Sequence, residues 1–222
     1  MGDESKKPRG ERTRQKILRA AHELFTKQGY HGTSMRQIAQ KVDLALGGLY
    51  NHFPGKEQVF RAVFEAYHPV LEVLPALTTA RGDTVEEFLQ DAVDRIIDAL
   101  EKRPQFINLL FIEVVEFKSA HMGELFISNF PMMMEVVQRI YQKNQDRLRP
   151  MPLPMFVRTF MGVFFSYYLT EILFAPVAPA EFSQGARDNF IQVYLHGILT
   201  DSARQQRIPL GVEGNIDRLE SK

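Results

Sequence analysis

The stretch Ser34–Phe53, SMRQIAQKVDLALGGLYNHF, decides the fold because it combines two short helices with a tight turn. Ile38 and Ala39 give the first of these helices an apolar face. Asp43 lies in the turn, where it tolerates a left-handed backbone better than most residues do. Pro54 ends the second helix, since the residue before a proline avoids the α region. This arrangement predicts a helix-turn-helix motif, whose second helix can enter the major groove of DNA.

The segments on either side of the motif predict two further helices. Residues 11–28 have apolar side chains at helical spacing, and Gly29 follows as a left-handed stop. A helix is also expected from Lys56 to Tyr67. Between the first helix and the motif, Thr33 occupies the position where we expect an N-cap. Together these segments predict a small helical domain around the motif.

Thr13–Phe60 resembles the tetracycline-repressor (TetR/AcrR) family in specific residues. These are Leu24-Phe25, Gly29-Tyr30, Thr33, Ile38-Ala39, Gly47-Gly48-Leu49-Tyr50-Asn51-His52-Phe53 and Lys56-Glu57. The resemblance implies an all-α fold with an N-terminal three-helix DNA-binding domain and a C-terminal helical domain that binds a ligand and dimerises. We expect the first domain, with its basic arm, at residues 1–62 and the second at residues 63–222.

The resemblance and the side-chain chemistry together predict a set of DNA-contacting residues. A hydroxyl or a positive charge can bind a phosphate, and paired glycines let the backbone approach DNA closely. Leu49 and Phe53 have the spacing of core residues that hold the recognition helix in place. The predicted contacts are Thr33, Arg36, Leu46, Gly47, Gly48, Tyr50, His52 and Lys56.

The recognition helix departs from the family pattern. The family often has Ser-Lys where this chain has Ala45-Leu46, and Thr where it has Gly48. Leu46 has the chemistry to contact a thymine methyl group instead. Affinity could then depend more on a basic N-terminal arm that follows the phosphate backbone or a minor groove. The arm residues are Lys6, Lys7, Arg9, Arg12 and Arg14.

The formal net charge of zero conceals two unlike parts of the chain. Residues 1–62 hold 12 Lys and Arg against 6 Asp and Glu, whereas residues 63–222 hold 15 against 21. This asymmetry favours a basic module that faces a polyanion, joined to an acidic module that does not.

The acidic part is rich in aromatic residues: residues 104–194 contain 12 of the 17 phenylalanines. Broad aromatic faces and flexible methionines suit a pocket for a small lipophilic effector, although they also suit an ordinary core. The candidate ligand-binding residues are Phe111, Glu113, Met133, Phe164 and Tyr168. Glu113 could alternatively form an internal Glu–Arg pair or lie on an exposed stripe of its helix.

The resemblance also implies a homodimer. We expect its interface on the last two long helices, residues 156–174 and 183–201, because they carry extensive apolar faces. The residues assigned to these faces are Phe160, Phe164, Tyr168, Ile172, Phe190, Tyr194 and Ile198.

Other classes of protein lack sequence support. There is no cysteine, the six histidines are scattered, and no nucleotide-binding or nucleophile motif is present, so we expect no enzyme, cofactor or metal. The longest uncharged apolar run is too short to span a membrane, and we expect a cytoplasmic protein.

The expected function is a ligand-responsive dimeric regulator, a repressor released from a palindromic operator by a small lipophilic effector. A dimeric adaptor without an effector and a helical enzyme carrying the motif remain alternatives.

Overall fold

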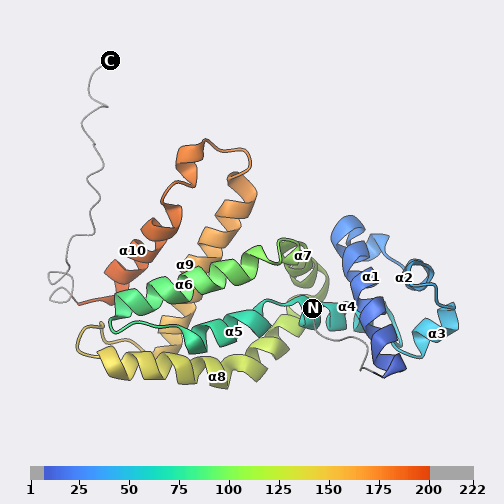
Figure 1. Cartoon of the computed structure of the whole chain (residues 1–222), viewed down its shortest axis with the longest axis horizontal. Coiled ribbons are helices and arrows are strands. Elements are labelled where there is room, and N and C mark those ends of the chain that lie inside the picture. Colours follow the sequence, from blue (N-terminus) through green and yellow to red (C-terminus); the bar gives the residue numbers. More distant parts are fainter. Residues whose placement is uncertain (1–7, 201–222) are drawn as a thin grey trace, which may run out of the picture. The chain divides into compact units, whose positions relative to one another are not determined.

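The computed structural model describes residues 8–200, and within this range the chain forms ten α-helices and one short 3-10 helix (Figure 1). No strand is formed by the described residues apart from an isolated bridge between Leu148 and Leu199. The fold is therefore all-α, as predicted. The elements are α1 (Arg9–Gly32), α2 (Met35–Lys41), α3 (Leu46–Tyr50), α4 (Lys56–Tyr67), α5 (Val70–Thr79), α6 (Val85–Glu101), α7 (Phe106–Phe117), α8 (Ala120–Asn144), α9 (Leu153–Phe174), η2 (Ala180–Phe182) and α10 (Ala186–Ile198).

The chain divides into two compact units. The first comprises the described residues up to Arg81 together with Asp91–Met133, and the second comprises Gly82–Gln90 together with the described residues from Met134 onward. The domain boundary expected after residue 62 lies inside α4, so the expected division into two functional domains does not coincide with the compact units. That functional division stays a prediction.

In the first unit, α1 packs against α2, α4 and α7. The centre of this packing is formed by side chains that are almost completely buried, and Leu49 and Phe53 join them as predicted. They include Ile17, Phe25, Ile38, Leu49, Phe53, Phe60 and Phe64. Burying large apolar side chains of this kind stabilises the fold by about 1.5–3 kcal/mol for each.

Two backbone predictions from the sequence are confirmed. Gly29 has a positive φ of 76° and breaks the regular helix of α1, so the last residues assigned to α1 follow a kink. Asp43 has a φ of 54° and makes the tight turn between α2 and α3. These two left-handed residues set the directions in which α2 leaves α1 and α3 leaves α2.

Two prolines lie inside helices of the described chain. Pro75 is inside α5, and Pro131 is inside α8, which extends from Ala120 to Asn144. A proline inside a helix removes one backbone N–H donor, and its ring crowds the carbonyl group of the preceding turn.

The second unit contains α9 packed against α10. Phe164 and Ile198 are buried, and the Tyr194 hydroxyl donates a hydrogen bond to the carbonyl oxygen of Phe156 at 3.1 Å. The prediction that Phe164, Tyr194 and Ile198 face a partner subunit was therefore wrong, because all three side chains are buried within one subunit. None of the described helices is both long and apolar enough to cross a membrane.

Candidate nucleic-acid interface

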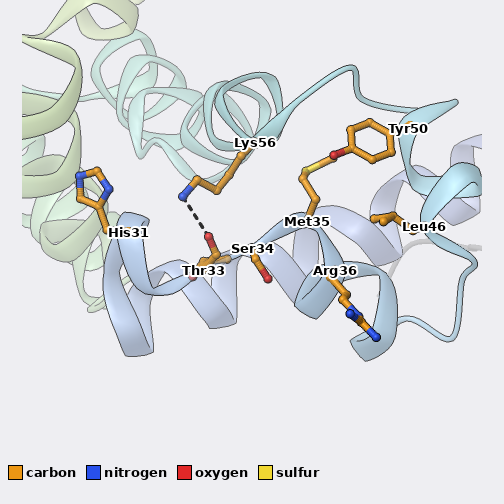
Figure 2. A pocket seen from close by; sticks show the side chains of 8 residues that line it. All are labelled: His31, Thr33, Ser34, Met35, Arg36, Leu46, Tyr50 and Lys56. Carbon is orange, nitrogen blue, oxygen red and sulfur yellow. Dashed lines mark hydrogen bonds between the residues drawn. The ribbon is translucent and has the colours of Figure 1, made fainter.

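A concave surface encloses a volume of about 450 Å³ (Figure 2). It is formed by the end of α1, the start of α2, α3 and the first residue of α4. Five of the predicted DNA-contacting residues line it, whereas Gly47, Gly48 and His52 do not. Three lining residues, His31, Ser34 and Met35, were not predicted. The complete lining is His31, Thr33, Ser34, Met35, Arg36, Leu46, Tyr50 and Lys56.

Ser34, and not Thr33, caps α2. The Gln37 backbone N–H donates to the Ser34 hydroxyl at 3.2 Å, and the Ser34 backbone N–H donates to the Gln37 side-chain oxygen at 2.8 Å. The prediction of a Thr33 cap was wrong by one residue, because the Thr33 hydroxyl bonds back to Gly29 and leaves the cap to Ser34. The spacing Ser-x-x-Gln is itself a capping-box signature and was visible in the sequence.

Thr33 instead belongs to the frame beneath the surface. Its side chain is buried, and its hydroxyl donates to the carbonyl oxygen of Gly29 at 2.9 Å. The Lys56 ammonium donates to the carbonyl oxygens of Tyr30 at 2.8 Å and Thr33 at 2.9 Å, the second of which is drawn in Figure 2. Burial lowers the pKa of Lys56 from its usual value, and the nearby Glu116 carboxylate opposes that shift. Lys56 therefore ties α4 to the connection between α1 and α2.

The recognition helix α3 divides into a buried and an exposed face. Leu49 is completely buried, whereas Leu46 is 41% exposed and Tyr50 is 48% exposed. Leu46 and Tyr50 are four residues apart and therefore share one face of the helix. A Cβ atom added at Gly47 would meet nothing within 4 Å, but one added at Gly48 would lie 3.1 Å from the Leu44 side chain. His52, just beyond α3, is half-buried.

The basic residues expected in an N-terminal arm lie partly in a helix. Lys6 and Lys7 lie outside the described residues, and Arg9, Arg12 and Arg14 belong to the first turns of α1. The Arg14 guanidinium lies 4.3 Å from the centroid of the Phe53 ring, so it stacks on the residue that follows the recognition helix. These three arginines are therefore helical residues and not part of an extended arm.

A buried pair of side chains, Glu113 and His121, lies in the first unit. The Glu113 carboxylate is completely buried and accepts hydrogen bonds from the His121 backbone N–H at 2.8 Å and the Met122 backbone N–H at 3.1 Å. Its second oxygen lies 2.9 Å from His121 Nδ1. Glu113 thus stabilises the start of α8, and its internal partner is a histidine instead of the arginine that we considered. These partners satisfy the buried Glu113 side chain without a ligand.

Aromatic contacts connect this pair to the concave surface. The Phe117 ring centroid lies 4.9 Å from that of His121 and 5.0 Å from that of Tyr30. Nearby, His31 Nε2 lies 2.7 Å from a carboxylate oxygen of Glu116, which joins the end of α1 to α7. The end of α1 is therefore held from two sides, by α4 and by α7.

The predicted effector-binding residues are distributed over both units. In the first unit Phe111 is 48% exposed, Glu113 is buried and Met133 is half-buried. In the second unit Phe164 is buried, and the buried Tyr168 hydroxyl has no hydrogen-bond partner. An effector site formed by all five stays a prediction. Among the described residues, no group of three or more His, Asp or Glu side chains is placed to hold a metal ion.

The first four helices and the concave surface define a helix-turn-helix protein. Residues 17–63 match the sequence profile of the family described as "Bacterial regulatory proteins, tetR family". The N-terminal domain of this chain is thus similar to that of the tetR family of bacterial regulators.

Similar proteins support this assignment. The chain is 42% identical over 69 residues to the transcriptional regulator TcmR of Streptomyces glaucescens, over 29% of this chain and 30% of TcmR. It is 34% identical over 106 residues to the transcriptional activator FasR of Mycolicibacterium smegmatis, over 47% of each protein. The matched region thus spans less than half the length of these relatives.

One solved structure is similar over most of the chain. The fatty acid degradation regulator FadR of Bacillus halodurans superimposes with a TM-score of 0.65 at 18% identity, over 86% of this chain and 96% of FadR. At this identity the likeness concerns the fold alone.

Proposed function

We propose that the chain is a transcriptional regulator that binds duplex DNA with the surface formed by α2 and α3. The observation that carries this proposal is the division of α3, with Leu46 and Tyr50 exposed beside the concave surface while Leu49 and Phe53 anchor the helix. A recognition helix needs such an arrangement, because its N-terminal residues contact base edges while the rest of the domain lies along the backbone.

The lining residues divide into contacting and positioning roles. Arg36 is exposed and carries a positive charge, and the exposed Tyr50 carries a hydroxyl, so both are suited to phosphate oxygens. Leu46 lies in the first turn of α3 and is suited to the base edges. Thr33 and Lys56 are engaged with backbone carbonyl oxygens and hold these groups in place.

The regulator acts as a homodimer that binds a palindromic operator. Apolar side chains of the second unit remain exposed on the side of α9 and α10 that is not used in their mutual packing. They include Met161 and Phe165 on α9, each close to half exposed, and Val193 on α10, which is 68% exposed. A two-fold axis through such a face would present two recognition helices to two half-sites.

A small lipophilic effector controls the affinity for DNA, and binding of the effector releases a repressor from its operator. The aromatic content of residues 104–194 and the unpartnered Tyr168 hydroxyl support a pocket of this chemistry. The relatives include an activator, FasR, so the direction of regulation needs its own measurement.

The test measures binding of the full chain to genomic duplex fragments by fluorescence anisotropy at several salt concentrations. Affinity should fall with rising salt, with a slope of log K of about −0.9 for each phosphate neutralised. Arg36→Ala should reduce both the affinity and the slope, while the exposed Arg139→Ala in the second unit should change neither. Affinity that is independent of salt would contradict the proposal. A reporter gene behind the bound fragment then distinguishes a repressor from an activator.

A further inference from the structure

The first turn of α3 offers a ligand no side chain that can donate or accept a hydrogen bond. Ala45 precedes the helix and is exposed, Leu46 is 41% exposed, and a Cβ atom at Gly47 would meet nothing within 4 Å. Tyr50 is the first residue of α3 whose side chain carries a hydrogen-bonding group. Base-reading helices contact base edges with their N-terminal residues. Here that part of the helix has no side-chain donor or acceptor.

Only one group in the major groove is apolar like the Leu46 side chain. Guanine, adenine and cytosine present donors and acceptors there, whereas thymine also presents a 5-methyl group. A leucine side chain pressed against a donor or acceptor would remove its water without replacing the hydrogen bond, which is unfavourable. Against a methyl group, the same side chain buries apolar surface and gains free energy.

We propose that Leu46 recognises the 5-methyl group of a pyrimidine and does not distinguish the base that carries it. Thymine has an acceptor at position 4 and 5-methylcytosine has a donor there, but both carry the methyl group at the same place in the groove. The first turn of α3 has no hydrogen-bonding side chain to tell these two groups apart. The inference rests on the proposed function, because it requires α3 to lie in the major groove.

The open backbone position next to Leu46 supports this assignment. Gly47 adds no side chain beside it, so nothing from that position competes for the groove floor. Leu49 and Phe53 are buried and fix the direction in which Leu46 projects. A fixed leucine beside an open backbone position can approach a methyl group without moving the rest of the helix.

The experiment uses the full chain and a duplex enriched from a pool with a randomised central segment. Each thymine of that duplex is replaced in turn by deoxyuridine, by cytosine paired with guanine, and by 5-methylcytosine paired with guanine. At one position of each half-site, deoxyuridine and cytosine should each lower the affinity about fourfold, the factor given by burial of one CH2-sized group. At the same position 5-methylcytosine should retain the affinity of thymine.

Two variants provide the controls. In Leu46→Ala, thymine and deoxyuridine should bind equally, because the partner of the methyl group has been removed. In Tyr50→Phe, affinity should fall on every duplex while the ratio of thymine to deoxyuridine stays near fourfold.

Three outcomes would overturn the inference. One is a wild-type chain that binds thymine and deoxyuridine equally at every position. Another is a thymine preference that persists in Leu46→Ala, and the third is a loss with 5-methylcytosine as large as that with cytosine. In all three cases salt-dependent binding to DNA would remain, so the proposed function would stand. A chain that binds no duplex would overturn both.

Discussion

The side chain of Lys56 contacts Tyr30 in two ways. Its ammonium donates to the Tyr30 carbonyl oxygen at 2.8 Å and lies 4.1 Å from the centroid of the Tyr30 ring. It also donates to the Thr33 carbonyl oxygen. Because α1 ends at this point and α2 starts beyond it, one cation sets the path between the two helices.

Replacing Lys56 with methionine should therefore destabilise the N-terminal unit. Two carbonyl oxygens would lose the ammonium donor, and the cation–π contact would disappear, for a loss of about 1–2 kcal/mol in the free energy of unfolding. Urea denaturation followed by circular dichroism measures the change. Lys41→Met is the matched control, because Lys41 forms an exposed ion pair with Glu23. Equal stability of the two variants would contradict the positioning role of Lys56.

Stability should fall as the solution becomes acidic, through His68. Burial, with a smaller effect of the Arg103 charge, lowers the pKa of His68 to about 4. His68 Nδ1 accepts a hydrogen bond from the Val70 backbone N–H at 3.1 Å, which requires the unprotonated nitrogen. The unfolded chain binds a proton near pH 6.5 and the folded chain only near pH 4, so stability is lost as the pH falls between these values.

The loss linked to His68 is up to about 3 kcal/mol over this interval. His68→Gln retains a side-chain acceptor that does not titrate, and it should flatten the dependence of the free energy of unfolding on pH between 6.5 and 4. Denaturation curves at a series of pH values test this expectation. An unchanged slope in the variant would assign the acid sensitivity to other groups.

Removing the Glu113 side chain should be among the most destabilising changes in the first unit. Glu113→Ala leaves the donors at the start of α8 and the His121 ring without their acceptor, with an expected loss of about 3 kcal/mol. Glu113→Gln should recover part of that loss, since an amide oxygen can still accept from the backbone. Thermal denaturation compares both with Glu116→Ala, whose exposed histidine partner predicts a change below about 1 kcal/mol. Similar effects of Glu113→Ala and Glu116→Ala would be inconsistent with this ranking.

Charges placed at two neighbouring positions of α10 should have different effects. Val193→Asp adds a charge on an exposed apolar face and should give folded monomers that bind the operator weakly. Tyr194→Asp buries a charge and removes an aromatic ring from between α9 and α10, so it should lower stability by about 3–5 kcal/mol. Light scattering and circular dichroism distinguish the two results. A dimeric Val193→Asp protein would place the interface elsewhere.

Local features of the fold could be predicted from the sequence, and features that depend on partners distant in the chain could not. Gly29 and Asp43 have the left-handed backbone that their residue types favour, and Leu49 and Phe53 are buried as their spacing indicated. By contrast, the pairing of Glu113 with His121 depends on the turn between α7 and α8, where Lys118 and Ser119 both have positive φ. Neither residue type indicates such a turn.

The same limit applies to the contacts of Lys56 and to the apolar faces of α9 and α10. Lys56 has the residue type and position of a phosphate ligand, but α4 directs its ammonium to two carbonyl oxygens. An apolar stripe on a helix indicates burial, but it does not indicate whether the covering surface belongs to the same chain. Tyr194 is covered by α9 of its own subunit, whereas its neighbour Val193 remains exposed.

The open space around Gly47 makes the protein a candidate scaffold for redesigned operator preference. A side chain introduced there would meet no neighbouring atom within 4 Å of its Cβ. New hydrogen-bonding groups could therefore be installed beside Leu46 without repacking the domain. A library of variants at this single position would sample new base preferences from a helix that already carries its anchoring residues.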